Sequence, residues 1–227
     1  MTKAYVLLSG GVDSSTCLYQ ACKDFGKENV KAYSVDYGQL HRKEMQYAAR
    51  MCSQLGIPHT ILKMSEQPAS PLTDTTQNEA IPDKSYNDLG QGVSPSYHHY
   101  RNGQLLSLLT AHASADLKGD ETGVIYAGQH AEDAANWAYP DCTAEFLGAQ
   151  ANAIFIGTYF RVRLSTPLTW LQKTDVVKLG ESLGVPWELT YSCYHGKDLH
   201  CGVCPTCRSR KEAFIAAGVN DPTHYAA

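Results

Sequence analysis

Residues 9–15 read Ser-Gly-Gly-Val-Asp-Ser-Ser and directly follow the apolar run at 5–8. Two adjacent glycines after a buried strand let the backbone turn tightly and direct several N–H groups into one concavity. Such a concavity at the start of a helix binds phosphate, and serine hydroxyls add donors. The loop lacks the Gly-Lys-Ser/Thr of a Walker loop. It predicts a phosphate site of another type, with an ordinary serine-capped turn as the alternative.

Four of the eight cysteines form a C-x7-C-x2-C-x2-C array near the end of the chain; they are Cys193, Cys201, Cys204 and Cys207. Four thiolates at this spacing fit a closed tetrahedral zinc site, which is structural and not catalytic. An iron–sulfur cluster is the alternative, since four cysteines also hold it. The compact array leads into a predicted helix at 208–217, which favours zinc.

These residues must be positioned by elements that alternate between strand and helix patterns. The predicted strands are 4–9, 30–35, 59–64 and 124–129, and the predicted helices are 14–25, 41–55, 102–117, 142–154 and 173–184. Such alternation predicts an α/β fold with a parallel sheet and right-handed crossovers. The binding crevice then lies at the carboxyl ends of the strands, where the loop 9–15 also lies.

The stretch 65–100 has no periodicity and is rich in Pro, Gly, Ser, Asn and Asp. A segment this long predicts a lid, a partner-binding arm or a disordered stretch. The helix at 173–184 ends with Gly184 and Pro186, which are helix stop signals. We expect an α/β domain over 1–186, and a C-terminal subdomain over 187–227 that carries the cysteine array and a terminal helix.

The composition bounds the class of protein. With 227 residues and 43% hydrophobic content, the chain can bury a substantial core. It has no run near the roughly 20 apolar residues of a membrane span and no signal-peptide pattern, so we expect a cytoplasmic protein without disulfides. The net charge of −4 argues against a broad nucleic-acid surface.

The SGGxDS pattern resembles the pyrophosphate loop of the N-type ATP pyrophosphatases, in which a substrate oxygen attacks the α-phosphate of ATP. Further stretches together resemble the QueC family, the 7-cyano-7-deazaguanine synthases; they are 36–44, 100–102, 139–142, 166–168 with Lys173, and 192–196. The resemblance covers residues 4 to about 217. It implies a HUP-like five-stranded parallel sheet with helices on both faces, a small zinc-bound appendage and a homodimer.

The resemblance also implies a reaction. An ATP-dependent ligase of this family converts 7-carboxy-7-deazaguanine and ammonia to 7-cyano-7-deazaguanine through an acyl-adenylate and an amide. A carboxylate is a poor electrophile, so adenylation makes it open to attack by ammonia. A second adenylation, on the amide oxygen, allows AMP to leave and a nitrile to form. Both steps need a pyrophosphate nest, Mg²⁺ and a cation near the α-phosphate. Free ammonia or a separate partner must supply the nitrogen.

The resemblance assigns roles to individual residues. The expected catalytic residues are Asp13, Arg101 and Lys173. The residues expected to bind ATP are Leu8, Ser9, Gly10, Gly11, Val12, Asp13, Ser14, Ser15, Gln39 and His41. Asp13 either binds Mg²⁺ through water or caps the helix. For Lys173 the alternative is a solvated residue at a helix start.

A deazaguanine presents adjacent N–H donors, and a carboxylate accepts such a pair bidentately. Asp141 is the first choice for this role, and the candidates behind it are Glu132, Asp133 and Glu145. Trp137, Tyr139 or Tyr194 could stack on the ring or belong to the core instead. Asn102 is either a substrate contact or a plain helix start.

The chain departs from the family pattern near the expected pocket, at Leu40, at 98–100 and in the longer loop 128–142. The alternative reading is therefore a related enzyme that stops at the amide or transfers the activated acyl group to another amine, in a phage or defence system. A tRNA-modifying pyrophosphatase is a third reading, which the low basicity disfavours. A non-enzymatic zinc module is a fourth, which the intact loop disfavours.

Overall fold

The computed structural model describes residues 1–65, 67–74, 76, 81, 92–196 and 198–226. Its strands are β1 (Thr2–Leu7), β2 (Val30–Asp36), β3 (His59–Lys63), β4 (Thr122–Tyr126) and β5 (Val162–Ser165). They form one sheet in the order β3-β2-β1-β4-β5, and every neighbouring pair is parallel. The predicted α/β fold with a five-stranded parallel sheet is confirmed. The residue pattern predicted four of these strands and missed β5.

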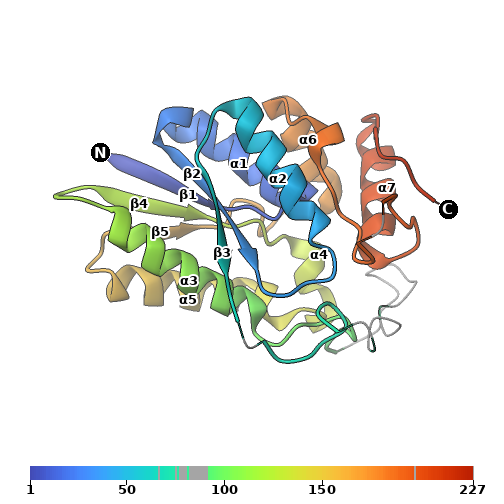
Figure 1. Ribbon diagram of the computed structural model, residues 1–227, viewed down its shortest axis with the longest axis horizontal. Coiled ribbons are helices and arrows are strands. Elements are labelled where there is room, and N and C mark those ends of the chain that lie inside the picture. Colours follow the sequence, from blue (N-terminus) through green and yellow to red (C-terminus); the bar gives the residue numbers. More distant parts are fainter. Residues whose placement is uncertain (66, 75, 77–80, 82–91, 197, 227) are drawn as a thin grey trace.

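The helices cover both faces of the sheet (Figure 1). The α-helices are α1 (Val12–Phe25), α2 (Lys43–Leu55), α3 (Arg101–Asp116), α4 (Ala131–Ala134), α5 (Ala144–Gly157), α6 (Lys173–Leu183) and α7 (Pro205–Ala217). Short 3-10 turns are η1 (Lys27–Asn29), η4 (Ala135–Trp137), η5 (Pro140–Cys142) and η6 (Trp187–Leu189). Helices α1, α2 and α6 lie on one face, and α3 and α5 lie on the other.

Strand β1 shows how the pleat divides the core between these two faces. Ala4 and Val6 belong to the apolar cluster that α1, α2 and α6 cover. Tyr5, between them in sequence, belongs to the cluster that α3 and α5 cover. Because alternate side chains of a strand point to opposite faces, a strand buried on both sides is apolar throughout.

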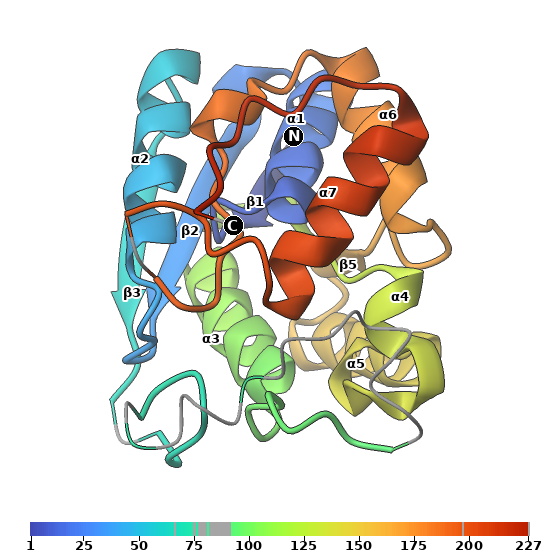
Figure 2. The ribbon, with the colours of Figure 1, turned by 90° about the vertical axis from the view of Figure 1, so that its right-hand side faces the viewer.

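Helix α7 lies beside α6 at one end of the molecule (Figure 2). Its Ala213 and Phe214 belong to the same buried cluster as Val176 and Val177 of α6. The ring of Trp187 packs edge-on against Phe214 at 5.1 Å between centroids. The C-terminal segment is thus continuous with the main core, and the expected division at residues 186 and 187 stays a prediction.

The described residues between 65 and 100 contain neither a helix nor a strand. Much of the predicted lid, at 66, 75, 77–80 and 82–91, lies outside the described residues. Across the part of the chain that the structure describes, no helix has the length and apolar character needed to cross a bilayer.

Candidate active site

A cavity of about 210 Å³ opens at the carboxyl ends of β1, β2 and β4. Its wall includes the loop that follows β1, residues that follow β2, the start of α3 and residues from Tyr191 onward. In parallel α/β sheets this edge is where ligands bind, because the loops there are free to diverge. The cavity is therefore the candidate active site.

The loop after β1 forms the concavity that its glycines predict. Gly10 has φ +96°, and a Cβ at this position would collide with the backbone carbonyl of Glu44. The N–H groups of Ser9 and Gly10 both donate to Ser14 Oγ at 3.2 Å, and Gly11 N–H donates to Ser9 Oγ at 3.2 Å. Successive N–H groups thus converge on hydroxyl oxygens just before α1 begins, as in an anion-binding nest.

Asp13 and Lys173 form a direct ion pair in the cavity wall, although 160 positions separate them in sequence. Lys173 Nζ donates to both Asp13 carboxylate oxygens at 2.6 Å, and it lies 3.3 Å from His130 Nε2. Burial alone would raise the pKa of Asp13, but Lys173 and His130 hold it below its ordinary value. Burial raises the pKa of the nearby Asp133. We call these four residues the Asp13 end of the cavity.

Glu132 fixes the position of Lys173. Its Oε1 accepts the backbone N–H of Lys173 at 2.8 Å, where α6 begins, and its Oε2 accepts from Ser209 Oγ of α7 at 3.4 Å. Gly128 lies against the backbone of Asp13, and a Cβ there would come within 3.1 Å of it. Glu132 therefore ties helices α6 and α7 to α4, the short helix that follows β4.

A second polar group lies in the same cavity and is formed by Tyr37, His41, Glu44 and Arg101, which we call the Glu44 end. Arg101 Nη1 donates to Tyr37 Oη at 3.2 Å, and His41 Nε2 lies 3.6 Å from Glu44 Oε1. Burial raises the pKa of Glu44 to about 8 and, together with Arg101, lowers the pKa of His41 to about 3. Sequence reasoning missed Glu44, although its i,i+3 spacing from His41 at a helix start was a usable signal.

The structure brings most of the predicted site residues to the cavity. Those that line it are Leu8, Ser9, Gly11, Val12, Asp13, Ser14, His41, Arg101, Asn102, Tyr139 and Lys173. The predicted ATP contacts that do not line it are Gly10, Ser15 and Gln39. The Gln39 amide is turned to the backbone, where it donates to Val35 O at 3.1 Å and accepts from Tyr37 N–H at 2.9 Å.

Two predicted substrate contacts lie outside the cavity lining. Asp141 is buried, and its Oδ2 accepts the backbone N–H of Asn102 at 2.8 Å, so it satisfies a free N–H in the first turn of α3. Trp137 is 60% exposed. Of the other candidates, Glu145 is exposed, whereas Asp133 and Tyr194 line the cavity.

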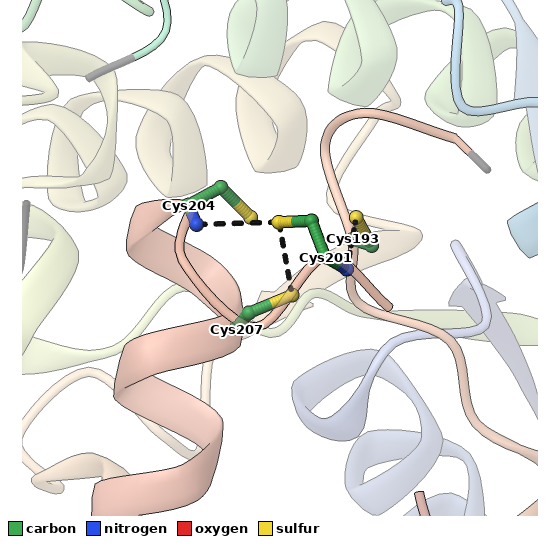
Figure 3. A group of neighbouring side chains, drawn as sticks. All are labelled: Cys193, Cys201, Cys204 and Cys207. Carbon is green, nitrogen blue, oxygen red and sulfur yellow. Dashed lines mark hydrogen bonds between the residues drawn. The ribbon is translucent and has the colours of Figure 1, made fainter. Parts of the chain in front are cut away.

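The four cysteine sulfurs of the C-terminal array lie within 4.8 Å of one another (Figure 3). Cys201 Sγ and Cys207 Sγ are 3.8 Å apart, which matches the edge of about 3.8 Å in a tetrahedron with Zn–S bonds of 2.3 Å. Backbone N–H groups of Val203 and Cys204 point at Cys201 Sγ, at 3.4 and 3.3 Å, and such donors favour the thiolate. The four residues fit a single metal ion.

The cysteine segment also builds one wall of the cavity. The backbone N–H of Tyr191 donates to Gly10 O at 2.8 Å, which ties this segment to the nest. His200 Nε2 accepts from Ser192 N–H at 3.0 Å, and its ring lies 4.5 Å from that of Tyr191. Ser192 and Tyr194 line the cavity as a result.

The family model described as "Queuosine biosynthesis protein QueC" matches residues 3–218. This chain belongs to the QueC family. A 7-cyano-7-deazaguanine synthase from Caldicellulosiruptor bescii is 40% identical over 227 residues, which are 98% of this chain and 97% of that protein. The synthase from Nostoc punctiforme is 38% identical over 99% of this chain and 100% of its own length. These QueC relatives match along nearly their whole lengths.

The solved structure of the U34-tRNA thiolase NcsA from Methanococcus maripaludis, with its [4Fe-4S] cluster, has a similar fold. The TM-score is 0.51 at 18% identity, and the match covers 94% of this QueC chain and 64% of the thiolase. The likeness supports the HUP-like α/β architecture and carries no argument about activity.

Proposed function

We propose that this chain uses ATP to convert 7-carboxy-7-deazaguanine and ammonia to 7-cyano-7-deazaguanine. The observation that carries the proposal is the pairing of Asp13 with Lys173 beside the nest, in a chain that matches named synthases from end to end. In this reading the substrate carboxylate attacks the α-phosphate, pyrophosphate leaves and an acyl-adenylate forms. Ammonia then gives the amide, and a second adenylation gives the nitrile.

The nest binds the β,γ-phosphates of ATP in this proposal. The N–H groups of Ser9, Gly10 and Gly11 now donate to serine hydroxyls, and phosphate oxygens replace those hydroxyls as acceptors. The loop backbone needs no rearrangement when phosphate oxygens replace the hydroxyls, because α1 already begins at Val12. Leaving pyrophosphate is thereby stabilised as its charge develops.

Lys173 stabilises the α-phosphate, and Asp13 would hold Mg²⁺. A carboxylate with a lowered pKa is ionised at neutral pH, which suits an oxygen ligand for a hard cation. When bound, Mg²⁺ neutralises phosphate charge. Phosphate oxygens draw Lys173 Nζ away from Asp13, which frees both carboxylate oxygens.

In this proposal Asp133 recognises the deazaguanine base, because Asp133 lines the cavity whereas Asp141 does not. Its Oδ2 lies 3.4 Å from His130 Nε2, and one carboxylate can accept two donors from a deazaguanine edge. Tyr139 lines the same region, and its hydroxyl is held by Ser96 Oγ at 2.7 Å. An anchored ring of this kind can stack on a planar substrate.

We assign zinc to the cysteine cluster. A [4Fe–4S] cluster binds each cysteine to a different iron, which spreads the sulfurs further than a single ion does. The spacing here, within 4.8 Å, supports one ion with a closed shell. Its role is to hold the wall at Tyr191–Ser192, with no part in the chemistry.

The remaining partners are proposals of the same kind. We propose that ammonia is taken up free or from a separate partner, that the chain acts as a homodimer, and that it contacts no nucleic acid directly. The net charge of −4 supports the last point, because nucleic-acid surfaces are basic.

A product that stops at the amide is the second candidate. The observation that favours it is His98, which departs from the family pattern and is buried behind the Glu44 end, with its ring 5.5 Å from that of Tyr37. Mass spectrometry of the products from 7-carboxy-7-deazaguanine, ammonium and Mg-ATP tests both candidates. A nitrile with AMP is expected; an accumulating amide supports the second candidate, and no consumption of the deazaguanine overturns both.

A further inference from the structure

The Glu44 end contains a buried ring nitrogen that has no hydrogen-bond partner in the part of the chain that the structure describes. His41 is 4% exposed and lines the cavity, and its Nδ1 has no hydrogen-bond partner among the described residues. When Glu44 is ionised, its Oε1, 3.6 Å from His41 Nε2, favours the tautomer with the proton on Nε2, which leaves Nδ1 as an acceptor. Buried polar atoms without partners are rare, so this one points to a ligand that donates hydrogen bonds.

Glu44 differs from the other two carboxylates that line the cavity. Asp13 is bound by Lys173, and Asp133 faces His130 at 3.4 Å. No lysine or arginine forms an ion pair with Glu44 among the described residues. In its ionised form, this carboxylate is therefore available to a small cation that enters the cavity.

We propose that His41 and Glu44 form an ammonium subsite, in which Glu44 is the base that converts ammonium to ammonia for attack on the acyl-adenylate. This inference rests on the proposed function. Ammonium is mostly protonated at neutral pH and has no lone pair, so amination needs a base near the activated carbon. A carboxyl with pKa about 8 can accept that proton, because its pKa lies near the working pH.

The proton and electron balance is simple. Ammonium donates to His41 Nδ1 and gives one proton to Glu44, which leaves ammonia and a carboxylic acid. The nitrogen lone pair forms a bond to the acyl carbon, and the bond from that carbon to the phosphate oxygen breaks. The second proton passes from nitrogen to the leaving AMP phosphate, and Glu44 later releases its own proton to water.

The groups that face Glu44 come from several elements. Arg101 of α3 contributes a positive charge that lowers the pKa of Glu44, and Gln39 donates a hydrogen bond that does the same. Arg101 thus keeps part of Glu44 ionised and disfavours ammonium relative to neutral ammonia. The ring of Tyr194, 5.7 Å from that of His41, adds an aromatic wall beside the subsite.

Glu44→Gln tests the proposal, because it keeps the shape of the side chain and removes the base. Three assays separate the steps: ATP–pyrophosphate exchange with 7-carboxy-7-deazaguanine and no ammonium, product formation with ammonium chloride, and product formation with hydroxylamine. Hydroxylamine is already unprotonated at neutral pH and needs no base. The matched control is Glu188→Gln, an exposed glutamate that does not line the cavity.

We expect Glu44→Gln to lower kcat/KM for ammonium about 10²-fold, as loss of a general base does, while exchange and the hydroxylamine rate stay within twofold. Unchanged ammonium kinetics, or equal losses with ammonium and hydroxylamine, would overturn the subsite. Loss of exchange in the variant would overturn it too, because Glu44 would then serve adenylation or folding. A wild-type chain without exchange would instead overturn the proposed function.

The second variant, Glu44→Asp, keeps a carboxylate base on a side chain that is shorter by one methylene group. It should recover part of the ammonium rate that Glu44→Gln loses. In the wild type, log kcat/KM for ammonium should level off as pH passes about 8, and in Glu44→Gln it should keep rising with free ammonia. A variant with the wild-type pH profile, or an aspartate with no recovery, would contradict the role of Glu44.

Discussion

Two partly buried carboxylates in one cavity have pKa values shifted in opposite directions. At the Asp13 end, Lys173 Nζ contacts both oxygens at 2.6 Å, and the pKa of Asp13 is lowered. At the Glu44 end no cation among the described residues binds the carboxylate directly, and the pKa of Glu44 is raised to about 8. The difference shows that a hydrogen-bonded cation outweighs burial at Asp13, whereas burial dominates the pKa of Glu44. In the proposed reaction, the Asp13 end binds phosphate and the Glu44 end transfers a proton.

Removal of the metal should have the largest effect on stability and activity, because it should disturb both the Asp13 end and the Glu44 end of the cavity. Cys204→Ser should abolish bound zinc and lower Tm by about 10 °C or more, since a structural zinc contributes on the order of 10 kcal/mol. Exchange and product formation should fall together, because Tyr191 N–H then no longer holds Gly10 O firmly. Metal analysis and thermal unfolding measure this.

Cys22→Ser is the matched control for the metal, since Cys22 is a half-buried cysteine outside the cluster. It should keep one zinc per chain. Iron in the purified protein, or zinc retained by Cys204→Ser, would contradict the assigned site.

Asp13→Ala should break the Asp13 end alone. Pyrophosphate exchange should fall about 10²–10³-fold, as when one preorganised electrostatic group is lost from an active site. Zinc content should not change, because the cysteine cluster is separate. Asp120→Ala, in an exposed loop, is the control and should keep the wild-type exchange rate. Exchange that survives in Asp13→Ala would show that the ion pair serves the fold and not ATP.

The smallest predicted effect is on the pH dependence of stability, which sharpens the comparison between the two carboxylates. A carboxyl with pKa about 8 in the folded chain, against 4.5 ordinarily, holds more protons folded than unfolded between those values. Its contribution to stability therefore falls as pH rises from about 4.5 to 8. The Tm of Glu44→Gln should match wild type near pH 4.5 and exceed it by a few degrees at pH 8.5. A constant difference in Tm between the variant and the wild type across this pH range would show that the pKa of Glu44 is not raised.

The parts of the site that depend on local sequence were predictable. The loop 9–15 determines its own nest, because glycine conformation and serine donors act within a few residues. The cysteine array likewise brings its ligands together over a short span. Sheet type followed from the alternation of strands and helices, while β5 was missed because only four residues form it.

The parts that depend on tertiary packing were not predictable from local sequence. Residue pattern alone cannot tell which carboxylate near 130–145 faces the cavity, and the structure buries Asp141 under the start of α3 while Asp133 lines the cavity. Lys173 was found through family resemblance, since no local pattern joins positions 13 and 173. For Glu44 the spacing from His41 was the one local signal, and the structure adds that Arg101 of α3 lines the same cavity and lowers the pKa of Glu44.

The most direct test is ATP–pyrophosphate exchange by the wild-type chain with 7-carboxy-7-deazaguanine and Mg²⁺, in the complete absence of ammonium. If the Asp13 end forms an acyl-adenylate before the Glu44 end supplies ammonia, labelled pyrophosphate should enter ATP, and only when the deazaguanine is present. Exchange that appears only after ammonium is added, or that does not depend on the deazaguanine, would contradict the claim that the two ends carry out separate steps.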